Sequence, residues 1–272
     1  MGLLITAEQT VKQKKRVIFD CSFNLRHPNA GRQQYASRHI PGSHYLDLAK
    51  DMSGDPGKEG RHPLPVRENF AERLRDLGVN GDSSVICYDQ NESAYATRLW
   101  WMIRWLGHDD VYVLDGGLKA WIEAGLDTDT RPASATQGNF IIQEPLTKVR
   151  NADDLVNTDD KIIDAREESR FLGLEEPIDP VAGHIPGATC APFFENLDEG
   201  YFLKPAELQK RFSRIFKDDP PGRKMVCYCG SGVTATHNIL ALMLAGFEEP
   251  ALYPGSWSHW INDPRRPIER SQ

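Results

Sequence analysis

The residues with the clearest chemical potential lie in the run 226–235, which reads Val-Cys-Tyr-Cys-Gly-Ser-Gly-Val-Thr-Ala. A short apolar strand pattern ends at Cys229, glycines follow at positions 230 and 232, and an apolar helical pattern comes next. Main-chain N–H groups of a Gly-rich turn at a helix N-terminus carry a partial positive charge. Such a turn favours a thiolate over a thiol, so the pattern predicts a nucleophilic sulfur at Cys229.

Other readings of these cysteines predict different chemistry. Cys227 lies two residues before Cys229 on the same strand pattern, and we expect it to pack in the core as a small apolar side chain. A zinc site is a weak alternative, because Cys-x-Cys lacks the second spaced pair that zinc sites use; its ligands would be Cys227, Cys229, His184 and Cys190. A cysteine phosphatase needs an arginine six residues after the nucleophile, where this chain has Ala235.

Composition limits the class of protein. The chain has 272 residues, of which 40% are hydrophobic and 26% charged, with a net charge of −7. These values are typical of a globular protein of two domains, and the negative charge argues against nucleic acid and anionic membranes as partners. Five cysteines, an odd number, and the lack of a signal-peptide or membrane-spanning pattern predict a cytoplasmic location.

The chain repeats itself. Four landmarks occur twice in the same order and at nearly constant spacing, pairing 17–20 with 161–164, 38–43 with 183–188, 85–89 with 225–229 and 114–117 with 253–256. The spacing is far longer than a solenoid repeat, so it indicates two similar domains in tandem. We place them at residues 1–144 and 145–272, after a linker composition over 127–137.

Short apolar strand patterns alternate with helical patterns in each copy, which predicts an α/β fold with parallel sheets flanked by helices on both faces. The expected strands include 17–20, 85–88 and 111–114, and the expected helices include 68–77, 94–106, 205–216 and 233–245. Thr6 and Gln9 form a predicted capping box at the first helix. Ligands bind beyond the carboxyl ends of the strands in such sheets, and Cys229 lies at such an end.

These features together resemble the two-domain rhodanese family of thiosulfate and 3-mercaptopyruvate sulfurtransferases. The resemblance rests on the His-Ile-Pro-Gly turns at 39–42 and 184–187, the cysteine loop and the duplication, and it covers nearly the whole chain. It implies an inactive N-terminal domain, in which Asp89 stands where the second copy has Cys229, and a catalytic C-terminal domain that carries a persulfide. It also implies a relay of Ser231 with His39, although the expected acid is absent from 27–30.

The donor is predicted from the charge of the loop. Gly230 and Ser231 are uncharged, whereas thiosulfate, a dianion, favours extra cations after the cysteine. The sequence therefore favours 3-mercaptopyruvate, with thiosulfate as the alternative donor. The resemblance implies one carboxylate-binding arginine at Arg170, and Ile178 stands where a second is common. The remaining predicted substrate-binding residues belong to the loop: Gly230, Gly232, Val233 and Thr234.

The expected mechanism needs no metal and no organic cofactor. Cys229 takes sulfur from the donor, and the acceptor is expected to be cyanide, a small thiol or thioredoxin. A sulfur-carrier or regulatory binding module in which neither domain turns over is the non-enzymatic alternative. The intact loop around Cys229 argues against that alternative.

Overall fold

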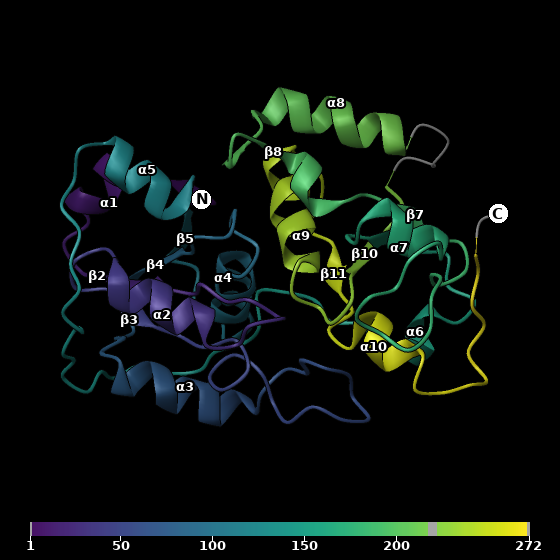
Figure 1. Cartoon of the computed structure of the whole chain (residues 1–272), viewed down its shortest axis with the longest axis horizontal. Helices are drawn as coiled ribbons and strands as arrows, with labels where there is room; N and C mark the ends of the chain where they lie inside the picture. The colour runs from purple at the N-terminus through teal and green to yellow at the C-terminus, as the bar shows by residue number, and fades with distance from the viewer. Residues whose placement is uncertain (1, 217–221, 271–272) are drawn as a thin grey trace. The chain divides into compact units, whose positions relative to one another are not determined.

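The computed structural model describes residues 2–216 and 222–270 (Figure 1). The chain divides into two compact units, each with its own sheet. The first unit consists of Met1–Gly54 and Leu64–Leu146, and the second of Asp55–Pro63 and Thr147–Gln272. The segment 55–63 therefore belongs to the second unit, although the sequence analysis placed it in the N-terminal domain.

The first unit contains five parallel strands in the order β1-β5-β4-β2-β3. The strands are β1 Leu4–Ile5, β2 Arg16–Asp20, β3 His44–Tyr45, β4 Ser84–Tyr88 and β5 Val111–Leu114. The helices are α1 Ala7–Lys12, α2 Ala30–Ser37, α3 Arg67–Asp76, α4 Ala96–Trp105 and α5 Gly117–Glu123. Figure 1 shows α1 and α5 on one side of this sheet and α3 on the other. The predicted capping box is confirmed, because Gln9 N–H donates to Thr6 Oγ1 and Thr6 N–H to Gln9 Oε1.

The second unit repeats this plan with four parallel strands in the order β11-β10-β6-β7. The strands are β6 Lys161–Asp164, β7 Thr189–Cys190, β10 Met225–Tyr228 and β11 Ala251–Leu252, beside a small hairpin of β8 Leu197–Asp198 and β9 Tyr201–Phe202. The helices are α6 Ala152–Leu155, α7 Glu168–Leu172, the 3-10 turn Phe193–Asn196, α8 Pro205–Ile215, α9 Ala235–Leu244 and α10 Ser256–Trp260. The predicted α/β fold of two similar domains is confirmed.

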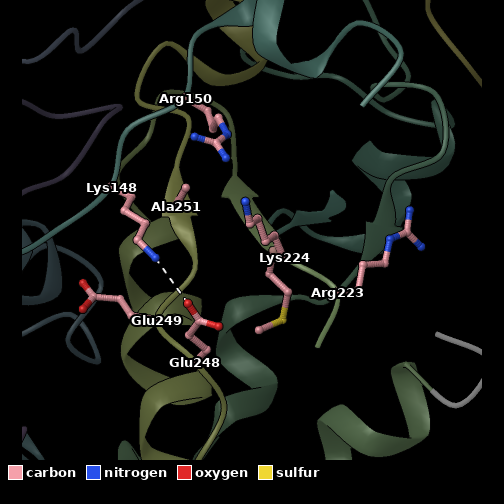
Figure 2. Close-up of a pocket in the computed structure, with 8 residues that line it drawn as sticks. Lys148, Arg150, Arg223, Lys224, Glu248, Glu249 and Ala251 are labelled. Carbon is pink, nitrogen blue, oxygen red and sulfur yellow. Dashed lines mark hydrogen bonds and ion pairs between the residues drawn. The ribbon is translucent and has the colours of Figure 1, made fainter. Parts of the chain in front are cut away.

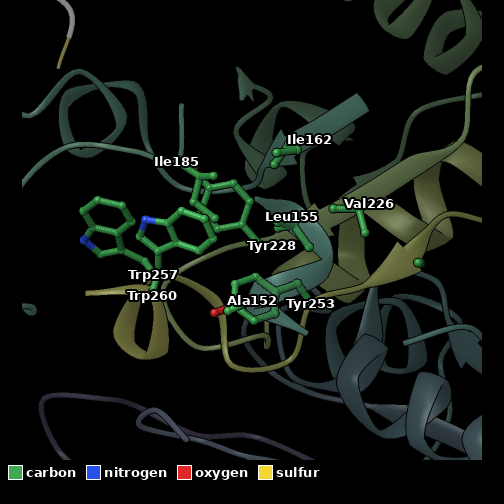
Figure 3. Close-up of a cluster of buried hydrophobic side chains, with 10 residues drawn as sticks. Ala152, Leu155, Ile162, Ile185, Val226, Tyr228, Tyr253, Trp257 and Trp260 are labelled. Atoms are coloured by element: carbon green, nitrogen blue, oxygen red, sulfur yellow. The ribbon is translucent and has the colours of Figure 1, made fainter. Parts of the chain in front are cut away.

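The core of the second unit explains how β10 is held. Alternate side chains of a strand face opposite sides of its sheet. Val226 and Tyr228 accordingly pack in one buried cluster with Trp257 and Trp260 of α10 and with residues of α6 (Figure 3). Cys227 faces the other side, where α9 packs against β10. Helices therefore pack against both faces of β10, which ends immediately before Cys229.

None of the described helices is long and apolar enough to cross a lipid bilayer.

Candidate functional site

Cys229 directly follows β10, at the carboxyl end of a strand that has neighbours on both sides. The residue is only 2% exposed. Its main-chain N–H donates to Ser256 Oγ at 3.1 Å. Its carbonyl oxygen accepts from Trp257 N–H at 3.0 Å, and the carbonyl oxygen of Gly230 accepts from Ser258 N–H at 2.9 Å. The turn that begins α10 therefore fixes the first two residues of the cysteine loop.

Four residues of the loop 230–234 have main-chain N–H groups without a hydrogen-bond partner in the described part of the chain. The main-chain N–H groups of Gly230, Ser231, Val233 and Thr234 make no hydrogen bond to any residue that the structure describes. Gly232 shapes the turn, because its φ is +74° and a Cβ there would lie 2.3 Å from the carbonyl oxygen of Pro254. Because the backbone polar groups of this loop are buried or nearly so, donors without partners are costly unless an anion binds them. The loop is thus a cradle for negative charge.

The same turn in the first unit already holds a carboxylate. Asp89 directly follows β4 and corresponds to Cys229 in the duplication. Its Oδ1 accepts from the N–H groups of Asn91 and Ser93, and its Oδ2 from those of Tyr95 and Ala96, at 2.8–2.9 Å. Burial raises the pKa of Asp89, while these four hydrogen bonds oppose that rise. The turn of this fold can therefore satisfy an acceptor-only side chain entirely from its main chain.

The contacts of Asp89 predict a loss of stability on its removal. Asp89→Ala should lower the free energy of unfolding by about 3 kcal/mol or more, because four buried or partly buried N–H groups lose their acceptor. Chemical denaturation followed by tryptophan fluorescence measures this change. Asp109→Ala, which removes an exposed carboxylate of the same unit, is the matched control and should change stability little. Equal stability of the two variants would contradict the assignment of Asp89 to a structural N–H cradle.

The other four cysteines lack such a turn. Burial raises the pKa values of Cys21, Cys87 and Cys227, and it raises the pKa of Cys190 to about 12. All five cysteines are free thiols in the structure. The described residues contain no cluster of metal ligands, so Cys190 and His184 do not form a metal site with Cys227 and Cys229. Cys190 Sγ lies 3.7 Å from the carbonyl oxygen of Arg166, and His184 Nδ1 lies 2.7 Å from the carbonyl oxygen of Phe171.

Sequence analysis missed the histidine that contacts the cysteine loop. His62 Nδ1 lies 2.8 Å from Ser231 Oγ, and both side chains are nearly buried. His62 belongs to segment 55–63, which is tied to the second unit by Arg61 N–H donating to Ser258 Oγ at 3.0 Å and by Asn262 Nδ2 donating to the carbonyl oxygen of Lys58 at 3.0 Å. A histidine and a serine in this contact form a pair that can transfer a proton.

The assignment of His39 to the Ser231 relay needs correction. His39 is fully buried, and its ring stacks on Tyr35 at 3.9 Å. Its Nδ1 lies 2.6 Å from the carbonyl oxygen of Tyr35 and its Nε2 lies 3.0 Å from that of Arg131. His184 repeats this arrangement by stacking on Phe171. Both ring nitrogens of His39 are thus occupied by main-chain groups, and the histidine beside Ser231 is His62.

Arg170, the predicted carboxylate-binding arginine, lies beside the cysteine loop. Its Nε donates to Glu176 at 3.0 Å, and its Nη2 donates to Asp179 Oδ2 at 3.1 Å. Its guanidinium also lies beside Gly230, 3.6–3.7 Å from where a Cβ on that glycine would be. Ile178, where a second arginine was sought, is 39% exposed, and its main-chain N–H donates to Glu176. Position 178 therefore contributes an apolar, half-solvated side chain.

A separate pocket lies at the opposite end of the sheet. Figure 2 shows that Lys148, Arg150 and Lys224 gather around the first residues of β10 and β11, with Glu248 and Glu249 nearby, and the hollow has a volume of about 220 Å³. Lys148 pairs with Glu248 at 3.2 Å, and Arg150 pairs with Asp160 at 3.3 Å. The pocket is at the amino ends of the strands, so it is not part of the Cys229 site.

Three comparisons relate this chain to known proteins. The model of the rhodanese-like domain matches residues 6–124 and again residues 148–263. The Pseudomonas aeruginosa protein named "Probable 3-mercaptopyruvate sulfurtransferase" is 46% identical over 97% of both chains. A Mycobacterium tuberculosis protein named "Putative thiosulfate sulfurtransferase SseB" is 36% identical over 93% of this chain and 90% of its own. The crystal structure of SseA from Escherichia coli superposes with a TM-score of 0.81 at 30% identity, covering 95% of this chain and all (100%) of that one.

Proposed function

The chain belongs to the two-domain rhodanese family of sulfurtransferases, and we propose that it transfers sulfur from 3-mercaptopyruvate through a persulfide on Cys229. The observation that carries this proposal is the set of unpaired N–H donors that follows Cys229. In the corresponding turn of the first unit, four N–H groups bind the carboxylate of Asp89, whose oxygens cannot accept sulfur. Only the second unit combines the cradle with a nucleophile.

The proposed first half-reaction forms one bond and breaks one. The Cys229 thiolate attacks the sulfur of the donor, an S–S bond forms, and the C–S bond breaks with its electron pair moving onto the carbon chain. Pyruvate leaves as its enolate, which then takes up the proton that the donor thiol gives up. The N–H groups of the loop stabilise the negative charge on the terminal sulfur of the persulfide. His62 and Ser231 are the proposed path for the proton.

In the proposed second half-reaction an acceptor thiolate attacks the outer sulfur of the persulfide and restores the Cys229 thiolate. Cyanide, a small thiol and reduced thioredoxin are the proposed acceptors. Two separate half-reactions predict ping-pong kinetics. The five free thiols fit a reducing compartment, so we propose a cytoplasmic location.

Direct detection of the intermediate tests the proposed function. Incubation with 3-mercaptopyruvate and no acceptor should release one pyruvate per chain and increase the protein mass by one sulfur atom. Cyanide should then remove that sulfur as thiocyanate. In parallel, kcat/KM should be higher for 3-mercaptopyruvate than for thiosulfate. A mass increase with thiosulfate but not with 3-mercaptopyruvate would instead support the thiosulfate sulfurtransferase alternative. If neither donor increased the mass, the result would support a non-catalytic module.

The position of Arg170 predicts its effect on donor binding. Arg170→Ala should raise KM for 3-mercaptopyruvate and lower kcat/KM about ten- to a hundredfold, because a charge-assisted contact with the donor carboxylate is lost. Steady-state kinetics measure this effect. Because Arg170 also forms ion pairs with Glu176 and Asp179, the melting temperature is measured alongside the kinetics. Arg170→Lys is the matched variant, since it keeps the positive charge but loses the paired N–H groups of the guanidinium. An unchanged KM in a folded Arg170→Ala protein would exclude Arg170 from the donor site.

A further inference from the structure

Arg61 is a second guanidinium at the cysteine loop. It precedes His62 in segment 55–63, which belongs to the same compact unit as Cys229. A Cβ on Gly230 would lie 3.0 Å from Arg61 Nη2 and 3.6 Å from Arg170 Nη2. Two arginines, more than a hundred positions apart in the chain, thus lie against the residue that follows the nucleophile.

The carboxylate of Asp179 forms ion pairs with both arginines. Asp179 Oδ1 accepts from Arg61 Nη1 at 2.5 Å, and Asp179 Oδ2 accepts from Arg170 Nη2 at 3.1 Å. The side chain of Asp179 is only 3% exposed, so its carboxylate is shielded from water, whereas the Arg61 side chain is 25% exposed. A buried carboxylate with two guanidinium partners orients each of them more firmly than a surface pair would.

Part of each guanidinium still lacks an acceptor. Arg61 Nε is buried and has no hydrogen-bond partner. Arg61 Nη2 and Arg170 Nη1 likewise make no hydrogen bond within residues 2–216 and 222–270. A buried guanidinium N–H without an acceptor costs free energy that an arriving anion would recover. Arg61 Nη2 and Arg170 Nη1 lie beside Gly230, the residue that follows Cys229.

We propose that Arg61 is the second cation of the donor-carboxylate subsite, acting with Arg170 and replacing the arginine that position 178 lacks. This inference rests on the proposed function, since it names a residue that would bind the carboxylate of the proposed donor. In 3-mercaptopyruvate two carbon atoms separate the sulfur from the carboxylate carbon. The subsite must therefore lie close to the nucleophile, and Arg61 and Arg170 border the very next residue. Arg61 would give the second unit a donor-binding residue from segment 55–63, which lies in the N-terminal half of the sequence.

The chemistry of arginine explains how the subsite would bind the donor carboxylate. A planar guanidinium presents paired N–H groups that match the two oxygens of a carboxylate. Arg61 can offer Nε and Nη2 together, because its Nη1 is already used by Asp179. A lysine at position 61 would keep the charge and lose this paired geometry. We therefore expect Arg61→Lys to bind the carboxylate less tightly than the natural arginine and more tightly than Arg61→Ala.

Pyruvate is the probe for the subsite, because it carries the same carboxylate and keto group without the reacting sulfur. Its binding is measured by calorimetry and by its protection of Cys229 from iodoacetamide in the full chain. Arg61→Ala should raise the Kd for pyruvate and the KM for 3-mercaptopyruvate by about ten- to a hundredfold. The kcat should change far less, since Arg61 binds the donor in both the ground state and the transition state. Lys224→Ala removes an exposed cation at the opposite end of β10 and should change neither constant.

Two results would overturn the assignment. Unchanged pyruvate affinity and KM in Arg61→Ala would exclude Arg61 from the subsite. A large fall in kcat with unchanged pyruvate binding would mean that Arg61 acts on Cys229 and not on the donor. If Arg61→Ala does not fold, Arg61→Lys and Arg61→Gln carry the same comparison at matched melting temperature. Arg61-dependent pyruvate binding in a protein that forms no persulfide would refute the proposed function and still support the subsite.

Discussion

Cys229→Ser should abolish sulfur transfer from 3-mercaptopyruvate and leave the fold intact. A serine hydroxyl cannot form a persulfide, and serine fits the volume of the cysteine that it replaces. The measurements are pyruvate release, the mass increase by one sulfur atom, and the circular dichroism spectrum. We expect the first two to fall to background and the spectrum to be unchanged.

The matched control is Cys227→Ser, two residues away on the same strand. Cys227 is fully buried against α9, and burial raises the pKa of its thiol. It should therefore remain a thiol at neutral pH, and its variant should keep most of the activity. Equal loss of persulfide formation in both variants would mean that the two cysteines act as a pair, which would refute the mechanism with a single nucleophile.

His62→Gln should lower kcat by about a hundredfold or more, within the range for removal of a general acid–base group. The reason is the 2.8 Å contact between His62 Nδ1 and Ser231 Oγ, which is the proposed path for the proton. Glutamine keeps a hydrogen bond to the serine but cannot exchange a proton at neutral pH. The kcat with saturating 3-mercaptopyruvate is the measurement, and Ser231→Ala together with His62→Gln should cost little more than either variant alone.

His39→Gln is the matched control for this prediction. Because both ring nitrogens of His39 contact main-chain oxygens of the first unit, we expect a lower melting temperature and a loss in kcat of less than about tenfold. A near-normal kcat for His62→Gln would contradict the proposed proton path. A hundredfold loss for His39→Gln at an unchanged melting temperature would restore His39 to the mechanism.

The roles of His39 and His184 could not be predicted from the sequence pattern alone. The His-Ile-Pro-Gly turn occurs in both copies, and its sequence cannot distinguish a catalytic ring from one that closes a turn. In the structure, His39 and His184 stack on Tyr35 and Phe171 in the same way. The repetition itself was the available signal, since a residue that both copies share is better explained by a role in the fold than by a role in one active site.

Much of this protein follows from local sequence. Thr6 and Gln9 cap α1 because their side chains satisfy main-chain groups only three residues away. The strands and helices follow from hydrophobic periodicity, and the duplication follows from landmarks in a constant order. The turn after Cys229 is equally local, because its glycines and the helix that follows determine where the N–H groups point. These features are why the fold class, and Cys229 as the proposed nucleophile, could be predicted from the sequence.

The tertiary structure alone decided which side chains surround that nucleophile. His62 and Arg61 lie in a Gly- and Pro-containing segment with no strand or helix period, and the residues that they contact, Ser231 and Asp179, are 169 and 118 positions away in the chain. Neither contact has a local energetic signature, because segment 55–63 is held by residues of the second unit that are distant in the chain, such as Ser258 and Asn262. A long loop without secondary structure was the only hint. The sequence thus determined the sulfur chemistry, whereas long-range packing determined the partners of Ser231 and Asp179.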